Sequence, residues 1–192
     1  MITGVEVPKD FVFVHIPKVA GHTIGVSLHK PVRSHTVARL LRAQSQPEAW
    51  EAAFKFCFVR NPWDHVVSWY NYHFNRHRAS MYNCTFEAWV KDGLKTHWKK
   101  DWCGEEVAND PLNQLLYFQD LAGKDIVDFI GAYENLEDDL AYISGVLGRD
   151  GITIPHLNKC DHKHYREFYT DETENIVRKR YACIIERFGY EF

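Results

Sequence analysis

A lysine and an arginine stand at the ends of two strand-like segments, each just before a helix-like segment. Lys18 follows the alternating β-formers of residues 11–16 and precedes Gly21 and a helix-like stretch. Arg60 follows the strand-like run 54–59 and precedes an Asn and a Pro that suit a helix start. A helix N-terminus presents unpaired N–H groups and the positive end of the helix dipole. A cation delivered there predicts an anion-binding site, and phosphate is the guest that suits it best.

The order of these residues differs from that of an ordinary nucleoside-triphosphate loop. A Walker A loop reads GxxxxGK[ST], with its lysine after the second glycine. Here Lys18 precedes Gly21, so an ATP or GTP loop is a poor match. Ser68 lies further along the helix that follows Arg60, where its hydroxyl could share an anion with the guanidinium.

Both segments resemble known motifs. HIPKVAGHT is similar to the 5′-phosphosulfate loop, and FVRNPWDHVVSWY to the 3′-phosphate motif, of sulfotransferases that use 3′-phosphoadenosine 5′-phosphosulfate (PAPS). The similar branch contains carbohydrate sulfotransferases and many bacterial relatives. GAYENLEDDL and the C-terminal segment are similar to that branch as well, so the resemblance runs from about residue 12 to residue 192.

The resemblance implies a fold and an activity. The expected fold is a P-loop NTPase-like three-layer α/β fold, and the expected organisation is a single sulfotransferase domain over residues 1–192. The expected reaction moves a sulfuryl group from PAPS, as co-substrate, to a hydroxyl-bearing acceptor and releases adenosine 3′,5′-bisphosphate. A carbohydrate or a related metabolite is the expected acceptor, by analogy with the family alone.

The resemblance also implies roles for single residues. Sulfuryl transfer develops charge on the bridging oxygen of the departing phosphate, and Lys18 is expected to stabilise that charge. Arg60 and Ser68 are expected to bind the 3′-phosphate, with an Arg60 to Asp64 ion pair as the alternative. The 5′-phosphate is expected to bind the Thr23 hydroxyl and four backbone amides, which belong to Gly21, His22, Thr23 and Ile24.

The acceptor hydroxyl needs a general base. We expect His35, because SHTVARLLR resembles the family's His-containing stretch after the phosphosulfate loop. A helix-capping or surface histidine is the alternative reading of His35. Weaker candidates lie in or near a polar stretch, residues 101–111, whose composition suits a surface lid; they are His97, Asp101, Glu105 and Glu106.

The chain departs from the family pattern at three positions. His22 stands where the family more often has Thr or Ser, and His65 where it commonly has Arg. Ala132 replaces an Arg that often precedes a Tyr-Glu pair. Backbone amides need no particular side chain, so the first departure leaves the phosphate loop competent. Trp63 and Tyr133 could stack on adenine, although core packing is the simpler reading of both.

The elements that must position these groups alternate along the chain. Strands are expected at 11–16, 54–59 and 126–131. Helices are expected at 22–29, 36–43, 48–53 and 62–76, twice within 85–118, and after the caps Asn135 and Thr170. This alternation predicts a parallel sheet with helices on both faces, in which ligands bind beyond the carboxyl ends of the strands. Lys18 and Arg60 both fall there.

Composition limits the class of protein. The 192 residues, 45% of them hydrophobic, fit one domain with a substantial core. No apolar run approaches the ~20 residues that cross a bilayer, and the first residues lack a signal-peptide pattern. We therefore expect a cytoplasmic protein, or the soluble domain of a trimmed membrane-anchored one, without a membrane partner. The formal charge of −3 gives no basic field, so no nucleic-acid partner is expected.

Metal chemistry and two other functions are weaker readings. His73 and His77 stand four apart, a spacing that suits zinc, but no third ligand is evident, so no metal is expected. The five cysteines form no CxxC motif and read as reduced thiols. A divergent P-loop nucleotide kinase is disfavoured because GK[ST] is missing, and a non-catalytic phosphonucleotide-binding module is the third reading. The acceptor, the regiochemistry and the oligomeric state stay open.

Overall fold

A three-stranded parallel sheet forms the centre of the computed structural model, which describes residues 11–29, 35–76, 84–96, 107, 109–149 and 163–192. The strands β1 (Phe11–Val14), β2 (Phe54–Val59) and β3 (Phe129–Ala132) lie in the order β1-β2-β3. The register pairs Val14 with Cys57 and Val59 with Ala132. The loops that follow the three strands therefore leave the sheet at one edge, where ligands of such sheets bind.

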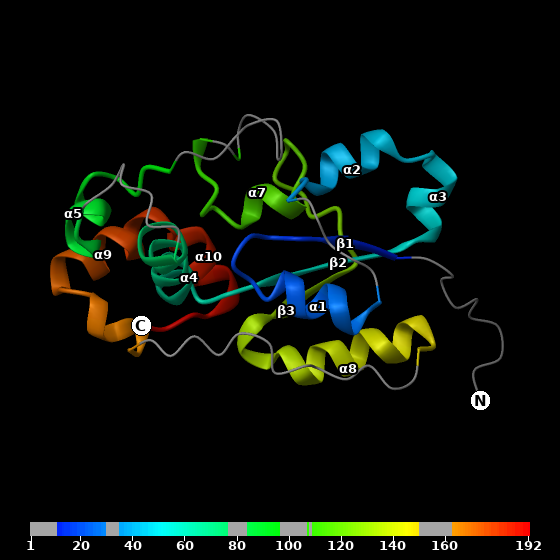
Figure 1. Ribbon diagram of the computed structural model, residues 1–192. Helices are drawn as coiled ribbons and strands as arrows, with labels where there is room; N and C mark the ends of the chain where they lie inside the picture. The colour runs from blue at the N-terminus through cyan, green and yellow to red at the C-terminus, as the bar shows by residue number, and fades with distance from the viewer. Residues whose placement is uncertain (1–10, 30–34, 77–83, 97–106, 108, 150–162) are drawn as a thin grey trace.

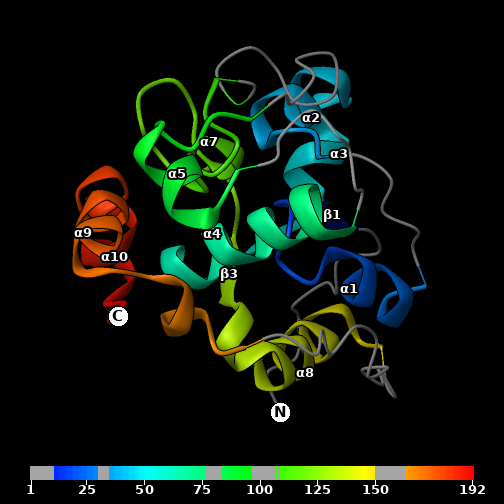
Figure 2. The ribbon, with the colours of Figure 1, turned by 60° about the vertical axis from the view of Figure 1, so that its left-hand side comes forward.

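Helices cover both faces of this sheet. Figures 1 and 2 show α1 and α8 on one face and α2 and α7 on the other, with α4, α5, α9 and α10 gathered beyond the strand ends. This is the predicted three-layer α/β arrangement. The bounds are α1 (Gly21–Ser27), α2 (Ala38–Gln44), α3 (Pro47–Ala52), α4 (Pro62–Tyr70), the π-helix η1 (Asn71–Arg76), α5 (Phe86–Lys91), α7 (Leu115–Phe118), the 3₁₀-helix η3 (Tyr133–Asn135), α8 (Leu136–Leu147), the 3₁₀-helix η4 (Tyr165–Phe168), α9 (Asp171–Arg180) and α10 (Ala182–Phe188).

Two hydrophobic clusters hold these elements together. The first surrounds the sheet, and the central strand β2 is buried along almost its whole length, as a parallel strand covered on both faces must be. The second lies among α4, α5, α9 and α10 and includes Trp63, Trp69 and Trp89. Because α4 starts directly after β2, it links the sheet to this second cluster. The residues that follow β2 thus lie between two packed bodies.

The predicted elements mostly exist, with shifted ends. The bounds of β2 match the prediction, whereas β1 stops at Val14 and β3 runs over Phe129–Ala132 instead of 126–131. The expected helix 62–76 is α4 followed by a π-helix. The expected final helix divides at Tyr181, whose ring is buried in the second cluster and whose hydroxyl donates to Asp110 at 3.2 Å. Tertiary packing therefore decides these ends.

Two further expectations concern a surface lid and membrane-spanning helices. The expected lid, residues 101–111, lies largely outside the described residues. Within the described residues, no helix is long and apolar enough to cross a bilayer.

Candidate active site

The turn from β1 into α1 uses left-handed backbone at two residues that are not glycine. Lys18 has φ of 63°, and Ala20, the N-cap of α1, has φ of 48°. Such torsions are costly for residues with a Cβ, so surrounding contacts must hold the loop in this form. Left-handed residues beside right-handed ones are the backbone pattern of anion-binding nests. The loop therefore shares left-handed residues with such nests.

The first turn of α1 leaves backbone donors outside the helix ladder. The Ile24 N–H donates to the Ala20 carbonyl at 3.0 Å, which is the first hydrogen bond of the helix. The N–H groups of Gly21, His22 and Thr23 have no partner within the described part of the chain. The expectation for Ile24 is corrected here, because helix formation uses its N–H and its side chain is buried. Three amides remain for an anion.

Gly21 is required by the close approach of a histidine ring. A Cβ built on Gly21 would lie 1.8 Å from Nε2 of His15, far inside any permitted contact. The imidazole of His15 in turn packs against that of His35, with 4.1 Å between the ring centroids. The glycine of the motif therefore makes room for a pair of imidazoles beside the phosphate loop.

His35 is held in one tautomer. Its Nδ1 lies 3.2 Å from the His15 carbonyl oxygen, and since a carbonyl oxygen can only accept, Nδ1 carries the proton of the neutral ring. Burial lowers the pKa of His35, the bond to His15 opposes this shift, and the charge of Lys18 adds to it. The neutral form is thus favoured, and Nε2 bears the lone pair that a general base needs.

Arg60 is buried and makes contacts on several sides. Its Nε and Nη2 atoms each lie 2.7 Å from Oδ2 of Asp64, and Nη1 donates to the Lys18 carbonyl at 3.0 Å. Its guanidinium carbon stands 4.1 Å above the Tyr133 ring. The pairing with Asp64, the alternative reading of the sequence, is therefore present. A guanidinium has five N–H bonds, so the contacts with Asp64 and Lys18 leave two for a further anion.

Gln114, which the sequence did not single out, and Glu134 of the Tyr-Glu pair fix the backbone at this point. Gln114, fully buried, accepts from the Arg60 N–H and donates to the Arg60 carbonyl, both at 2.8 Å. Glu134 accepts from the Asn61 N–H at 2.7 Å, while the Asn61 side chain caps α4 by accepting from the Trp63 N–H. No local pattern marks Gln114, which lies 54 positions from Arg60.

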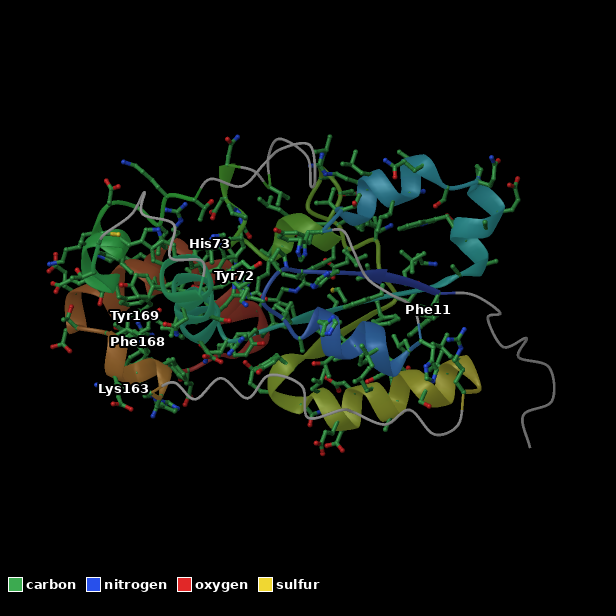
Figure 3. The ribbon with its side chains drawn as sticks, viewed as in Figure 1. Phe11, Tyr72, His73, Lys163, Phe168 and Tyr169 are labelled. Carbon is green, nitrogen blue, oxygen red and sulfur yellow. The ribbon has the colours of Figure 1, made fainter. Side chains whose placement is uncertain are left out.

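One side of α4 and η1 faces the Lys18 loop. His65 Nε2 donates to the Pro17 carbonyl at 2.8 Å, and burial lowers the pKa of His65 to about 3. The Lys18 Nζ lies 4.2 Å from the centroid of the Tyr72 ring. Figure 3 labels Tyr72 and His73 where η1 continues α4. Ser68, partly exposed, lies one turn after Asp64 and one turn before Tyr72.

The remaining candidates fall elsewhere. Trp63 is fully buried, and its indole N–H donates to the Glu174 carbonyl, so the core reading holds for it. The ring of His73 stacks on Trp69 at 4.9 Å. The described residues contain no cluster of three or more metal-ligating side chains. Five candidates lie outside the described residues, namely His77, His97, Asp101, Glu105 and Glu106.

The sequence of this chain matches a known protein family. A model described as "Sulfotransferase family" matches residues 5–191, almost the whole chain. The chain belongs to the sulfotransferase family. Both phosphate motifs lie inside the matched residues, so the resemblance stated from the sequence is confirmed. Membership of this family supports a transferase of sulfuryl groups.

A relative from Archaeoglobus fulgidus extends the comparison without adding a function. It is described as an uncharacterized protein and is 32% identical over 130 residues, which are 68% of this chain and 97% of the relative. No solved structure gives a significant match to this sulfotransferase-family chain.

Proposed function

We propose that this protein transfers the sulfuryl group of PAPS to a hydroxyl of a carbohydrate or a related metabolite. The observation that carries the proposal is the meeting of the two phosphate motifs, in which the Arg60 guanidinium donates to the Lys18 carbonyl at 3.0 Å. A nucleotide with phosphates at its 3′ and 5′ positions needs two such phosphate-binding sites side by side. The parallel register of β1 and β2 supplies that proximity.

In this proposal the residues of the β1–α1 loop have two roles, phosphate binding and stabilisation of the leaving group. The amides of Gly21, His22 and Thr23, with the Thr23 hydroxyl, bind the 5′-phosphate. Lys18 stabilises the negative charge that develops on the bridging oxygen as the sulfur–oxygen bond breaks. Cations and N–H donors that are already in position before the reaction lower its barrier most when they face the atom on which negative charge develops.

His35 completes the reaction as the base. The acceptor oxygen attacks the sulfur, its proton passes to Nε2 of His35, and the electron pair of the broken bond stays on the departing adenosine 3′,5′-bisphosphate. The neutral tautomer held by His15 leaves Nε2 as the acceptor. No metal is needed in this scheme, because Lys18 and the amides supply the positive charge.

Arg60 and Ser68 bind the 3′-phosphate. The two remaining N–H bonds of the Arg60 guanidinium and the Ser68 hydroxyl are the donors, while Asp64 keeps the guanidinium in place. A guanidinium fork suits a phosphate better than a point charge does. The site should therefore prefer 3′-phosphorylated nucleotides.

Binding measurements test this function first. Adenosine 3′,5′-bisphosphate should raise the thermal unfolding midpoint, and ATP should not. Arg60→Ala should weaken bisphosphate binding about 10- to 100-fold, as a lost charged hydrogen bond predicts, and should weaken adenosine 5′-phosphate binding less, so that the preference for the 3′-phosphorylated nucleotide is lost. Arg42→Ala, at an exposed arginine in α2, is the control. Stabilisation by ATP instead would support a nucleotide kinase.

Transfer measurements test it second. With labelled PAPS and a panel of hydroxyl acceptors, Lys18→Ala should lower kcat by about 100-fold or more, the usual loss when one oxyanion donor is removed. Lys124→Ala, at an exposed lysine, should leave kcat unchanged. Near-normal turnover of the Lys18 variant would contradict the role of Lys18. Nucleotide binding with no transfer to any acceptor would favour a binding module.

A further inference from the structure

Tyr72 stands where the long helix after β2 changes its winding. It is the second residue of η1, the π-helical continuation of α4. A π-turn inserted in an α-helix redirects the side chains that follow it, and such turns are frequent at functional sites. In this protein the ring of Tyr72 lies against the ammonium of Lys18, with 4.2 Å between Nζ and the ring centroid.

The Lys18 loop is held at three points from the same side. The Arg60 guanidinium donates to the Lys18 carbonyl at 3.0 Å, and His65 Nε2 donates to the Pro17 carbonyl at 2.8 Å. These two contacts fix the backbone of the loop, including the left-handed torsion of Lys18. The Tyr72 contact, by contrast, acts on the far end of the Lys18 side chain.

The far end of a lysine is the part that most needs positioning. Four rotatable bonds separate its ammonium from the backbone, and a rate that depends on the ammonium falls when those bonds are free. An aromatic face attracts an ammonium strongly enough to change a population by about 2- to 30-fold. This attraction is weaker than that of a phosphosulfate, so a bound ligand can still take the ammonium from the ring.

We propose that Tyr72 is a positioning residue that holds the Lys18 ammonium at the phosphosulfate site before the ligand binds. The inference rests on the proposed function of Lys18, and it adds a residue outside the two phosphate motifs. Tyr72 does not touch the reacting atoms in this role. Its ring face is what matters, so Phe should replace it and Leu should not.

Lysine NMR tests the contact without reference to activity. In protein with isotope-labelled lysine, assigned through a Lys18→Arg variant, the ε-CH₂ signal of Lys18 should be shifted upfield by the ring. The shift should persist in Tyr72→Phe and disappear in Tyr72→Leu. Tyr142→Leu, at a half-exposed tyrosine that packs on Phe129, is the matched control and should leave the shift unchanged. A shift unaffected by Tyr72→Leu would overturn the proposal.

Kinetics test the consequence. Tyr72→Leu should lower kcat for sulfuryl transfer about 5- to 30-fold, and Tyr72→Phe should restore it to within about 2-fold of the wild type. The Kd for adenosine 3′,5′-bisphosphate should change by less than about 2-fold in Tyr72→Leu, because the fully charged 5′-phosphate of this ligand attracts the ammonium more strongly than the ring does. A weakened Kd with reduced thermal stability would indicate a merely structural role and overturn the proposal.

The outcomes separate this inference from the function on which it rests. Wild-type protein that transfers sulfate, with Tyr72→Leu transferring it equally fast, would overturn the role of Tyr72 alone. Wild-type protein that neither binds the bisphosphate nor transfers sulfate would overturn the proposed function and any role of Tyr72 in it. In that case the NMR shift still decides whether Tyr72 holds Lys18.

Discussion

At the scale of single residues, His15 determines both the tautomer of His35 and the space beside Gly21 at the phosphate loop. His15 fixes the tautomer of His35 through its carbonyl oxygen, and its ring occupies the space that Gly21 leaves open. The charge of Lys18 helps to keep His35 neutral. The neutral imidazole of His35, the ammonium of Lys18 and Gly21 thus depend on one another, although they lie up to 17 positions apart in the sequence.

Replacing His35 should remove one limb of the pH–rate profile. The pKa of His35 lies below its ordinary value of 6.5, chiefly because of burial, so the wild-type rate should fall only as the pH drops through that lowered pKa. His35→Ala should lower kcat about 100-fold and abolish this acid limb. The measurement is kcat against pH with a proven acceptor. An unchanged profile with full turnover would eliminate His35 as the base.

The effect of Gly21→Ala on the free energy of unfolding should change sign when His15 is replaced by alanine. Gly21→Ala should lower the free energy of unfolding by about 1–3 kcal/mol, because the new Cβ meets the His15 ring. In a His15→Ala background the same change should raise it by up to about 1 kcal/mol, since alanine favours a helix over glycine. Urea unfolding of the four proteins measures both effects. Equal destabilisation in both backgrounds would show that the ring is not the cause.

Residues beside the strands were predictable, and their distant partners were not. Lys18 and Arg60 could be placed because each follows a strand and precedes a helix start, patterns that are local in the sequence. Gln114 and Tyr72 reach them only through folding, and an ordinary Gln or Tyr carries no mark of that contact. Ile24 was misplaced because the helix started one residue earlier than expected, at Gly21.

At the scale of elements, α4 decides how the two phosphate motifs meet. Its N-cap, Asn61, and its first proline were predicted and are present. The π-turn that ends it was not predicted, because a π-helix over Asn71–Arg76 at the end of a helix is too short to show in the apolar spacing of the sequence. His65 on this helix replaces an arginine common in the family, and it binds the Pro17 carbonyl as a neutral donor.

The neutrality of His65 predicts a loss of stability in acid. Burial lowers its pKa to about 3 in the folded protein, whereas the unfolded chain takes up a proton near the ordinary value of 6.5. The unfolded state therefore binds more protons between these values, and the free energy of unfolding should fall by up to about 1.4 kcal/mol per pH unit as the pH drops from 6.5.

A glutamine variant isolates this effect. His65→Gln keeps a donor near Pro17 but cannot titrate, so the difference in unfolding free energy between the two proteins should change with pH below 6.5. Urea unfolding at several pH values measures it. Parallel pH curves for the wild type and His65→Gln would contradict the assignment.

At the scale of the whole molecule, the last residue of the chain closes the second hydrophobic cluster. The Phe192 ring lies 5.5 Å from that of Trp63 and 5.4 Å from that of Tyr169, measured between centroids. Figure 3 labels Phe168 and Tyr169, which pack on Phe86 of α5. The α/β order and the sheet could be predicted from strand and helix periods, whereas this aromatic cluster depends on contacts between distant segments.

Removing the Phe192 ring should loosen the second cluster selectively. Phe192→Ala should lower the free energy of unfolding by about 1–2 kcal/mol, the range for lost aromatic contacts of a half-buried ring. The tryptophan band of the near-ultraviolet circular dichroism should change as well, because the Trp63 ring loses its contact with the Phe192 ring. Tyr142→Ala, in α8 on the first cluster, is a matched control that should leave that tryptophan signal unchanged.

The position of Arg60 between the two hydrophobic clusters has a consequence for internal motion. Lys18 follows a strand of the first cluster, and Ser68 lies on the helix that anchors in the second. A nucleotide bound to both would tie the two clusters together and oppose local opening of either one. When the nucleotide binds, amide hydrogen exchange should then slow in both α8 and α9, neither of which contributes a residue to the proposed nucleotide-binding site.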